Sequence, residues 1–422
     1  MEDLFKTEIS ALLGGEISCE CGKQHHTNAR VRKGKFTEEI GKLAAKYAPL
    51  SSAVFVSSRG FFLERGGEVL RAVQSGGSDA VNVVLSRRFD NALENLGGLL
   101  SLPENVRLVV VCESELYDAA AYFSALKGIP LAYAALSPEA EGVLSPVVTL
   151  KIKNKPERLY ADNPRFLIAD EDELAAAPKE SVAAAFASLA SHIVSLVDYR
   201  VRGVLTGDFC RASYNLARSA VSDSINAVYA ENAALRLLEN RVRMAAAEIF
   251  TDGAVSCGGE NAAAELLESS GKSRLSAAER KFFASVILID LYAAYFSAPH
   301  ELLCVPDYGA RAEELAAYTG YGEGEILKNM LACAPLAREE KLAPHIRQLA
   351  EETETLRGWM PKIAATYLKL GGRDIFRNFT YAELVRAVCR APDLPGAFSV
   401  LTLMRESGAL ELLAAENAKI SF

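Results

Sequence analysis

Short runs of apolar, mostly β-branched residues recur in the first half of the chain, and stretches with helical spacing separate them. The runs cover residues 53–56, 80–85, 108–111 and 130–133. A short run that is apolar at every position is typical of a strand buried on both faces, which is the setting of a parallel sheet. Residues 146–153 and 165–169 predict further strands that close this α/β domain.

The second half of the chain has a different sequence pattern. From about residue 173 the strand signals stop, and long segments rich in Ala, Leu and Glu follow, with the periodicity of amphipathic helices. At 422 residues the chain is also longer than a single hydrophobic core usually grows. We therefore predict a nucleotide-binding type of α/β domain over residues 1–172 and an all-helical domain over residues 173–422.

Composition excludes some partners. The formal charge of −8 argues against nucleic acid and anionic membranes, and the basic stretch 30–35 is interpreted as a solvated face. The most apolar segment, residues 285–298, is too short to span a bilayer. Eight scattered cysteines and no apparent signal peptide indicate reduced thiols and a cytoplasmic protein. The ligand stays unknown, and homo-oligomer formation is left open.

A cluster of potential metal ligands lies near the N-terminus. The segment contains Cys19, Cys21, His25 and His26 within eight residues, a content that indicates a zinc site. The Cys-x-Cys spacing lacks the usual two-to-four-residue loop between the cysteines. We therefore interpret the segment as an N-terminal turn without metal, and a structural zinc site is the alternative.

Residues 182–199 carry the most specific resemblance to a known family. Four residues match its helix pattern, namely Phe186, Leu189, Leu196 and Asp198, and Tyr199 stands where Trp is usual. The N-terminal Cys-x-Cys-Gly-Lys-x-His segment and the hinge-like residues 169–178 match as well. The chain thus resembles the sn-glycerol-1-phosphate dehydrogenases of the iron-containing alcohol dehydrogenase and dehydroquinate synthase superfamily.

This resemblance implies both a fold and a reaction. The fold is an N-terminal Rossmann-like α/β domain followed by an all-α C-terminal domain. In active relatives, NAD(P)H delivers hydride to dihydroxyacetone phosphate, while zinc or a similar divalent metal polarises the carbonyl.

The family's metal ligands are only partly present. Ser188 stands where the family has a liganding Asp, Asn261 stands where it has His, and His300 retains the third ligand. Neutral hydroxyl and amide groups are poor ligands for such an ion. A shifted site made of His192, Glu265 and His300 is the alternative to a chain that holds no catalytic metal.

The cofactor loop also departs from the family pattern. After the strand 108–111, the phosphate-binding glycines are replaced, and the corresponding positions are Glu113, Ser114, Glu115 and Asp118, of which only Asp118 matches. Two carboxylates at the phosphate position oppose dinucleotide binding, and the lost glycines prevent close backbone approach. The plain alternative is an acidic helix start. We expect no bound NAD(P)H.

Two candidate catalytic residues remain. Glu141 lies in the segment that matches the substrate loop, and His192 stands where the family has a cleft lysine. With Glu260, Glu265 and His300, they would form a polar cluster better suited to a cation than to a phosphorylated polyol. The functional hypothesis is a diverged pseudoenzyme that acts as a binding or partner protein. The alternative is an active NAD(P)-dependent oxidoreductase with a remodelled metal site.

Overall fold

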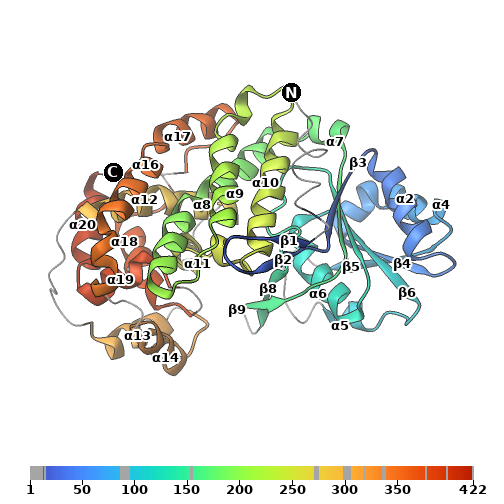
Figure 1. Cartoon of the computed structure of the whole chain (residues 1–422). Coiled ribbons are helices and arrows are strands. Elements are labelled where there is room, and N and C mark those ends of the chain that lie inside the picture. Colours follow the sequence, from blue (N-terminus) through green and yellow to red (C-terminus); the bar gives the residue numbers. More distant parts are fainter. Residues whose placement is uncertain are drawn as a thin grey trace. The chain divides into compact units, whose positions relative to one another are not determined.

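The computed structural model describes residues 13, 16–85, 96–152, 155–269, 275–297, 306–317, 319–334, 339–375, 378–395 and 398–420. The chain divides into two compact units (Figure 1). The sheet unit comprises Met1–Ala185 with Tyr229–Gly253, and the helical unit comprises Phe186–Val228 with Ala254–Phe422. The α/β and all-α fold class expected from the sequence is confirmed.

The core of the sheet unit is a parallel sheet of six strands in the order β3-β10-β7-β6-β4-β5. Five of these strands were expected from the sequence, and their ends differ from the expected ones by a few residues: β4 (Ser52–Ser58), β5 (Asp79–Leu85), β6 (Val106–Val111), β7 (Leu131–Ala135) and β10 (Arg165–Ala169). The sixth strand, β3 (Ala29–Lys33), was not expected. Most of the basic stretch 30–35 belongs to edge strand β3, whose backbone pairs in parallel with β10, while its side chains are exposed or half-buried.

Two short antiparallel hairpins accompany the main sheet. One pairs β1 (Glu16–Ser18) with β2 (Gln24–His26), and the other pairs β8 (Val147–Ile152) with β9 (Lys155–Tyr160). The strand expected over residues 146–153 therefore exists as β8. It forms a separate hairpin and does not extend the parallel sheet.

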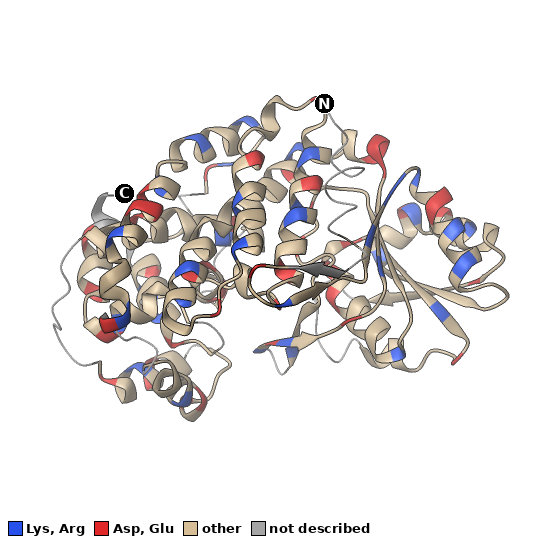
Figure 2. Cartoon of the chain, in the orientation of Figure 1, with Lys and Arg blue, Asp and Glu red and all other residues tan. Residues whose placement is uncertain are grey.

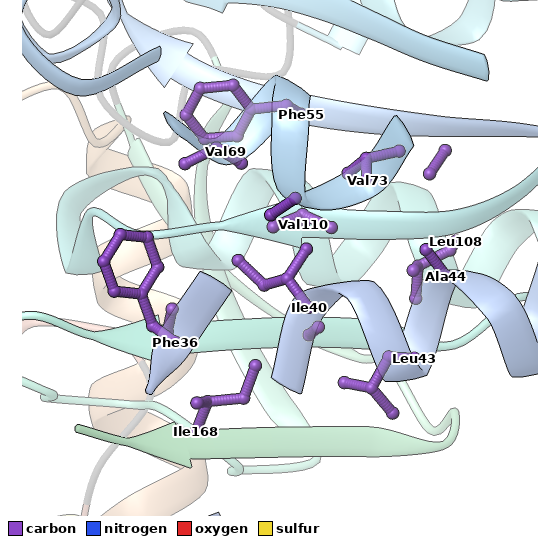
Figure 3. Close-up of a cluster of buried hydrophobic side chains, with 14 of the residues drawn as sticks. Phe36, Ile40, Leu43, Ala44, Phe55, Val69, Val73, Leu108, Val110 and Ile168 are labelled. Carbon is purple, nitrogen blue, oxygen red and sulfur yellow. The ribbon is translucent and has the colours of Figure 1, made fainter. Parts of the chain in front are cut away.

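Helices cover both faces of the parallel sheet. On one face, α2 (Phe36–Tyr47) and α4 (Gly67–Ser75) pack their apolar side chains against Leu108 and Val110 of β6 (Figure 3). Val109 and Val111 alternate to the opposite face, where α6 (Tyr117–Lys127) contacts β6 and β7. The sheet is buried on both sides, as its continuous apolar strands require.

The sheet unit contains further helices among its described residues. They are α3 (Arg59–Phe61), the π-turn Phe62–Gly66, α5 (Leu96–Leu100), α7 (Glu171–Ala175) and α10 (Ala233–Ile249). Helix α10 lies outside the predicted range 1–172, but it groups with the sheet because it contacts α7 and because Phe250 at its end stacks on His25. The domain boundary read from the sequence stays a prediction.

The described part of the helical unit consists of helices and short turns. The longest helix, α8 (Lys179–Thr206), runs from the sheet unit's range into this one. The others are α9 (Arg211–Ser224), α11 (Gly259–Ser269), α12 (Ala277–Ser297), α13 (Tyr308–Ala316), α14 (Glu323–Cys333), α15 (Glu339–Leu342), α16 (Ile346–Arg357), α17 (Met360–Lys369), α18 (Tyr381–Arg390), α19 (Val400–Ser407) and α20 (Leu410–Ile420).

One described helix, α8, is long and apolar enough to cross a membrane by length and composition, and 78% of its most apolar window is buried inside the protein. Buried core helices of soluble proteins have the same composition. The sequence had pointed to residues 285–298 as the most apolar segment, and most of that segment lies in α12. Basic and acidic side chains are interspersed along the helices (Figure 2).

Candidate functional site

The carboxyl edge of the parallel sheet is where α/β proteins of this type bind nucleotides. Here strands β4 and β6 are neighbours, and they end at Ser58 and Val111. The buried carboxylate of Glu113 accepts hydrogen bonds from the Ser58 backbone amide at 2.6 Å and from the Ser58 hydroxyl at 2.7 Å. The amide and hydroxyl of Ser58 could bind an anion such as a phosphate, but the Glu113 carboxylate already occupies both donors.

The rest of this loop is engaged within the sheet unit as well. Ser114–Leu116 forms a 3-10 turn that leads into α6, and Glu115 is exposed. Asp118 accepts a hydrogen bond from the Thr149 amide of β8 at 3.1 Å. Glu113 does not cap its own turn, so the interpretation as a simple acidic helix start is incomplete. These residues do not fit a dinucleotide phosphate, which needs close, uncompensated backbone donors.

In the helical unit, one face of α8 carries the family's metal position. Ser188, His192 and Ser195 recur at helical spacing and are all buried. The Ser188 hydroxyl finds no hydrogen-bond partner among the described residues. Ser195 donates a short hydrogen bond to Glu260 near the start of α11, so this face of α8 is directed at α11.

Asp198, one helical turn further along α8, joins three helices. Its carboxylate accepts hydrogen bonds from the backbone amide of Gly259 at 2.8 Å, from the amide of Val400 at 2.7 Å and from the Tyr292 hydroxyl at 3.2 Å. Gly259 is needed here because a Cβ atom on it would lie 2.6 Å from the Tyr292 hydroxyl oxygen. Burial nevertheless raises the pKa of Asp198 to about 7.

Glu260 is the second buried acid of this cluster. One carboxylate oxygen accepts from Ser195 and from the Asn261 amide, the latter at 3.1 Å. The other oxygen has no hydrogen-bond partner among the described residues. Burial raises the pKa of Glu260 to about 8, and the neighbouring Asp198 charge adds to the shift. At neutral pH this acid is predominantly protonated.

These residues do not fit the family's divalent metal. The Asn261 amide nitrogen does not act as a metal ligand, because it donates hydrogen bonds to the Ser256 carbonyl oxygen at 3.0 Å and to Glu260. Ser188 offers a neutral hydroxyl and Asn261 a neutral amide, and both are poor ligands for such an ion. The retained family ligand, His300, lies outside the described residues. No catalytic step through a metal follows from this donor set.

The remaining predicted site residues are distributed over both units. Glu141 lies in a turn between β7 and β8 of the sheet unit. His192 is buried on α8, and Glu265 is half-buried on α11, both in the helical unit. Within the helical unit, the structure places Ser195, Asp198, Glu260 and Asn261 in one connected network.

A polar cavity of about 240 Å³ lies in the sheet unit, near the amino ends of β3 and β10. Arg165, the first residue of β10, lines it and is only 3% exposed. Its Nε donates to the Asn163 side chain at 3.0 Å, but neither terminal nitrogen has an acceptor among the described residues. Lys23 adds positive charge to this cavity, and Asp162 and Asp252 add negative charge. The buried guanidinium is the group in it that suits an anionic ligand such as a carboxylate or phosphate.

Sequence reasoning missed three of these residues. Ser58 and Ser195 have no motif around them, although Ser58 is a polar residue at the end of an apolar strand, a position that points to the ligand edge of a parallel sheet. Arg165 opens a buried strand, and an arginine next to such a run was a signal that could have been used.

Comparisons with known proteins agree with this fold. No family model matches the chain. A glycerol-1-phosphate dehydrogenase [NAD(P)+] of Bacillus licheniformis is 23% identical over 237 residues, covering 54% of this chain and 58% of the relative. The corresponding protein of Halalkalibacterium halodurans is 25% identical over 221 residues, covering 48% and 53%. The match therefore spans little more than half of the length of these relatives.

Solved structures cover nearly the whole chain. A glycerol dehydrogenase from Schizosaccharomyces pombe has a TM-score of 0.57 at 12% identity and covers 93% of this chain and 91% of its own. An iron-containing alcohol dehydrogenase from Thermococcus thioreducens gives 0.57 at 12%, with coverage of 93% and 98%. The fold is that of the iron-containing alcohol dehydrogenase superfamily. The curated homologues are glycerol-1-phosphate dehydrogenases, which confirms the resemblance found in the sequence.

Proposed function

We propose that this protein is a diverged relative of the glycerol-1-phosphate dehydrogenases that no longer performs metal-dependent hydride transfer and acts by binding a ligand or partner. The observation that carries the proposal is the buried carboxylate of Glu113 on the amide and hydroxyl of Ser58. This carboxylate occupies donors at the sheet edge where relatives with a phosphate loop hold the cofactor.

The energetics support the loss of dinucleotide binding. Hydrogen bonds to a charged group contribute about 1.5–3 kcal/mol each, so a cofactor phosphate would first have to displace two such bonds. The displaced carboxylate would then remain beside the phosphate as a like charge, together with exposed Glu115. Both effects weaken binding.

The helical unit supports the same proposal. Ser188 and Asn261 supply no anionic or imidazole ligand, and the nearby buried carboxyl groups have pKa values raised to about 7 and about 8. A bound divalent cation would instead favour ionised carboxylates. The polar network therefore has a packing role, since it joins α8 to α11, α12 and α19.

A second candidate function is a remodelled NAD(P)-dependent oxidoreductase. The observation that favours it is Glu260, whose pKa of about 8 suits a proton donor near neutral pH. Such an enzyme would still need a cofactor site, and Glu113 argues against the ancestral one.

The experiment that separates these functions is a turnover assay on the full chain. NADH and NADPH oxidation is followed with dihydroxyacetone phosphate, with and without added zinc, and the Bacillus licheniformis relative serves as the positive control. We expect no oxidation above the protein-free rate. Saturable oxidation that a chelator abolishes would establish the oxidoreductase instead.

The cavity at Arg165 supplies a place for a small anionic ligand under the binding proposal. Inorganic phosphate and acetate are suitable probes, with thermal unfolding as the readout. We expect at least one of them to raise the melting temperature of the wild type but not of Arg165→Gln. The exposed variant Arg107→Gln is the matched control. Equal shifts in all three proteins would show that the cavity binds no anion.

A further inference from the structure

The N-terminal hairpin brings together the thiol and imidazole groups that the sequence places within seven residues. Strands β1 and β2 pair antiparallel, with Ser18 opposite Gln24. Between them, Gly22 adopts a φ of +79°, which favours glycine, and its amide donates to the Cys19 carbonyl oxygen at 3.0 Å. This tight turn holds Cys19 and Cys21 on the same side as the end of β2.

The three candidate ligand atoms converge. The sulfur atoms of Cys19 and Cys21 and a ring nitrogen of His25 all lie within 4.8 Å of one another. The Cys21 sulfur and His25 Nε2 are 3.3 Å apart. Zinc–sulfur bonds of about 2.3 Å and zinc–nitrogen bonds of about 2.0 Å place tetrahedral ligands at separations of this size.

The imidazole is held in position independently of any metal. His25 is 5% exposed, and its ring stacks on Phe250 with 4.6 Å between centroids and 23° between planes. A ligand fixed in this way loses little conformational entropy when it binds an ion. The two cysteines are only half-buried, so an ion can reach them from solvent.

The geometry of the hairpin brings the ligand atoms together in spite of the short Cys-x-Cys spacing. A two-to-four-residue spacing between the cysteines is typical of zinc knuckles. Here the third ligand comes from the opposing strand of the hairpin, and the turn at Gly22 closes the distance.

We propose that Cys19, Cys21 and His25 bind a zinc ion, which occupies three positions of a tetrahedral site and cross-links the hairpin. This site is independent of the ancestral catalytic metal and of the proposed function. On binding, both thiols release their protons to water, and the imidazole donates its Nε2 lone pair.

The ion has a physical role in this place. A hairpin with three residue pairs is too short to be stable alone, and a metal cross-link supplies the missing stability. His25 also lines the cavity that contains Arg165, together with Lys23 and His26. The metal thereby fixes one wall of that cavity.

The test uses the full chain with reduced thiols. Zinc is measured by elemental analysis, and cobalt is added to metal-free protein because cobalt–thiolate coordination gives a charge-transfer absorption that zinc lacks. The variants are Cys19→Ser/Cys21→Ser and His25→Ala. Cys389→Ser, a buried cysteine of α18 in the helical unit, is the matched control.

We expect about one metal per chain in the wild type and the control, with a cobalt–thiolate band. The double cysteine variant should lose the band, and its metal affinity should fall on the order of 100-fold or more. If His25→Ala fails to fold, the double cysteine variant carries the test, because its two replaced side chains are only half-buried. Circular dichroism verifies that this variant is folded. No band in the reduced wild type, or equal metal content in the double variant, would overturn the proposal.

Discussion

The Asp198 carboxylate accepts a hydrogen bond from the Gly259 backbone amide at 2.8 Å, and this bond fixes the start of α11 on α8. Asp198 is among the residues that carry the sequence resemblance to the dehydrogenases. Its other partners, the Val400 amide and the Tyr292 hydroxyl, come from α19 and α12. The resemblance at this position therefore reflects packing of the helical unit, which can persist when the metal ligands are replaced.

The close approach at Gly259 predicts a large effect of a small substitution. In Gly259→Ala the new Cβ would lie 2.6 Å from the Tyr292 hydroxyl oxygen and force it away from Asp198. We expect a loss of about 2–4 kcal/mol in unfolding free energy, from overpacking and a broken buried hydrogen bond. Urea unfolding measures it. Gly324→Ala in α14 is the control, because open space surrounds it and the change should be neutral or slightly stabilising.

The buried acids predict a pH dependence of stability. The folded-state pKa values of Asp198 and Glu260 are raised to about 7 and about 8 from the ordinary values of 3.8 and 4.5. The folded state binds these protons more tightly than the unfolded state. The resulting stabilisation is complete below about pH 4 and is lost as the pH rises toward 8, at roughly 1 kcal/mol per pH unit for each group.

Glu260→Gln isolates the contribution of one of these acids. The variant cannot titrate at this position, so its stability relative to wild type should improve as the pH rises from about 5 to 8. Unfolding free energies at several pH values in this range give the difference. A difference that stays constant with pH would show that Glu260 is ionised in the folded state throughout.

The metal positions predict a gain of function. In a Cys19→Ser/Cys21→Ser background, which removes the hairpin site, Ser188→Asp/Asn261→His restores the two ligand types that the family pattern has at these positions, and His300 matches the third. We expect zinc to raise the melting temperature of this variant and to have no effect on the background protein. Replacing His300 in the variant should abolish the shift. A zinc-dependent shift in the background protein would instead favour the shifted site of His192, Glu265 and His300.

The cofactor loop can be tested in the same way. The variant Cys112→Gly/Glu113→Ser/Ser114→Gly/Glu115→Thr removes both carboxylates and restores two glycines. We expect dinucleotide affinity to rise by at least about tenfold, because the Ser58 donors and backbone amides become available to phosphate. Glu104→Ser/Glu157→Ser, two exposed changes, gives the same change in net charge and is the control. Unchanged affinity in the loop variant would place the cofactor contacts elsewhere.

Much of the fold could be predicted because periodicity is a local signal. Buried strands such as β6 contain a continuous apolar run, here residues 108–111, and α2 and α4 bury their apolar side chains against the sheet. Strand β3 was missed because its alternating Arg and Val residues belong to an edge strand, where charged side chains remain solvated. Strand β8 forms a hairpin because it pairs with β9, and a local sequence pattern does not predict which strands pair.

The candidate site was less predictable because it depends on long-range contacts. The sequence showed that Glu113, Ser188 and Asn261 replace family residues, and that information came from position in a motif. It could not show that Glu113 binds Ser58, 55 positions earlier, or that Ser195 binds Glu260, 65 positions later. Raised pKa values likewise follow from burial, which only the folded chain determines.

The central claim is that the sheet edge no longer accepts a dinucleotide because Glu113 already holds the Ser58 donors. Isothermal titration calorimetry of the wild-type chain with NADH and NADPH tests it most directly. We expect no saturable heat of binding at dinucleotide concentrations below about 1 mM. A dissociation constant of about 1 mM corresponds to a binding free energy near −4 kcal/mol. A dissociation constant in the micromolar range for either dinucleotide would contradict it.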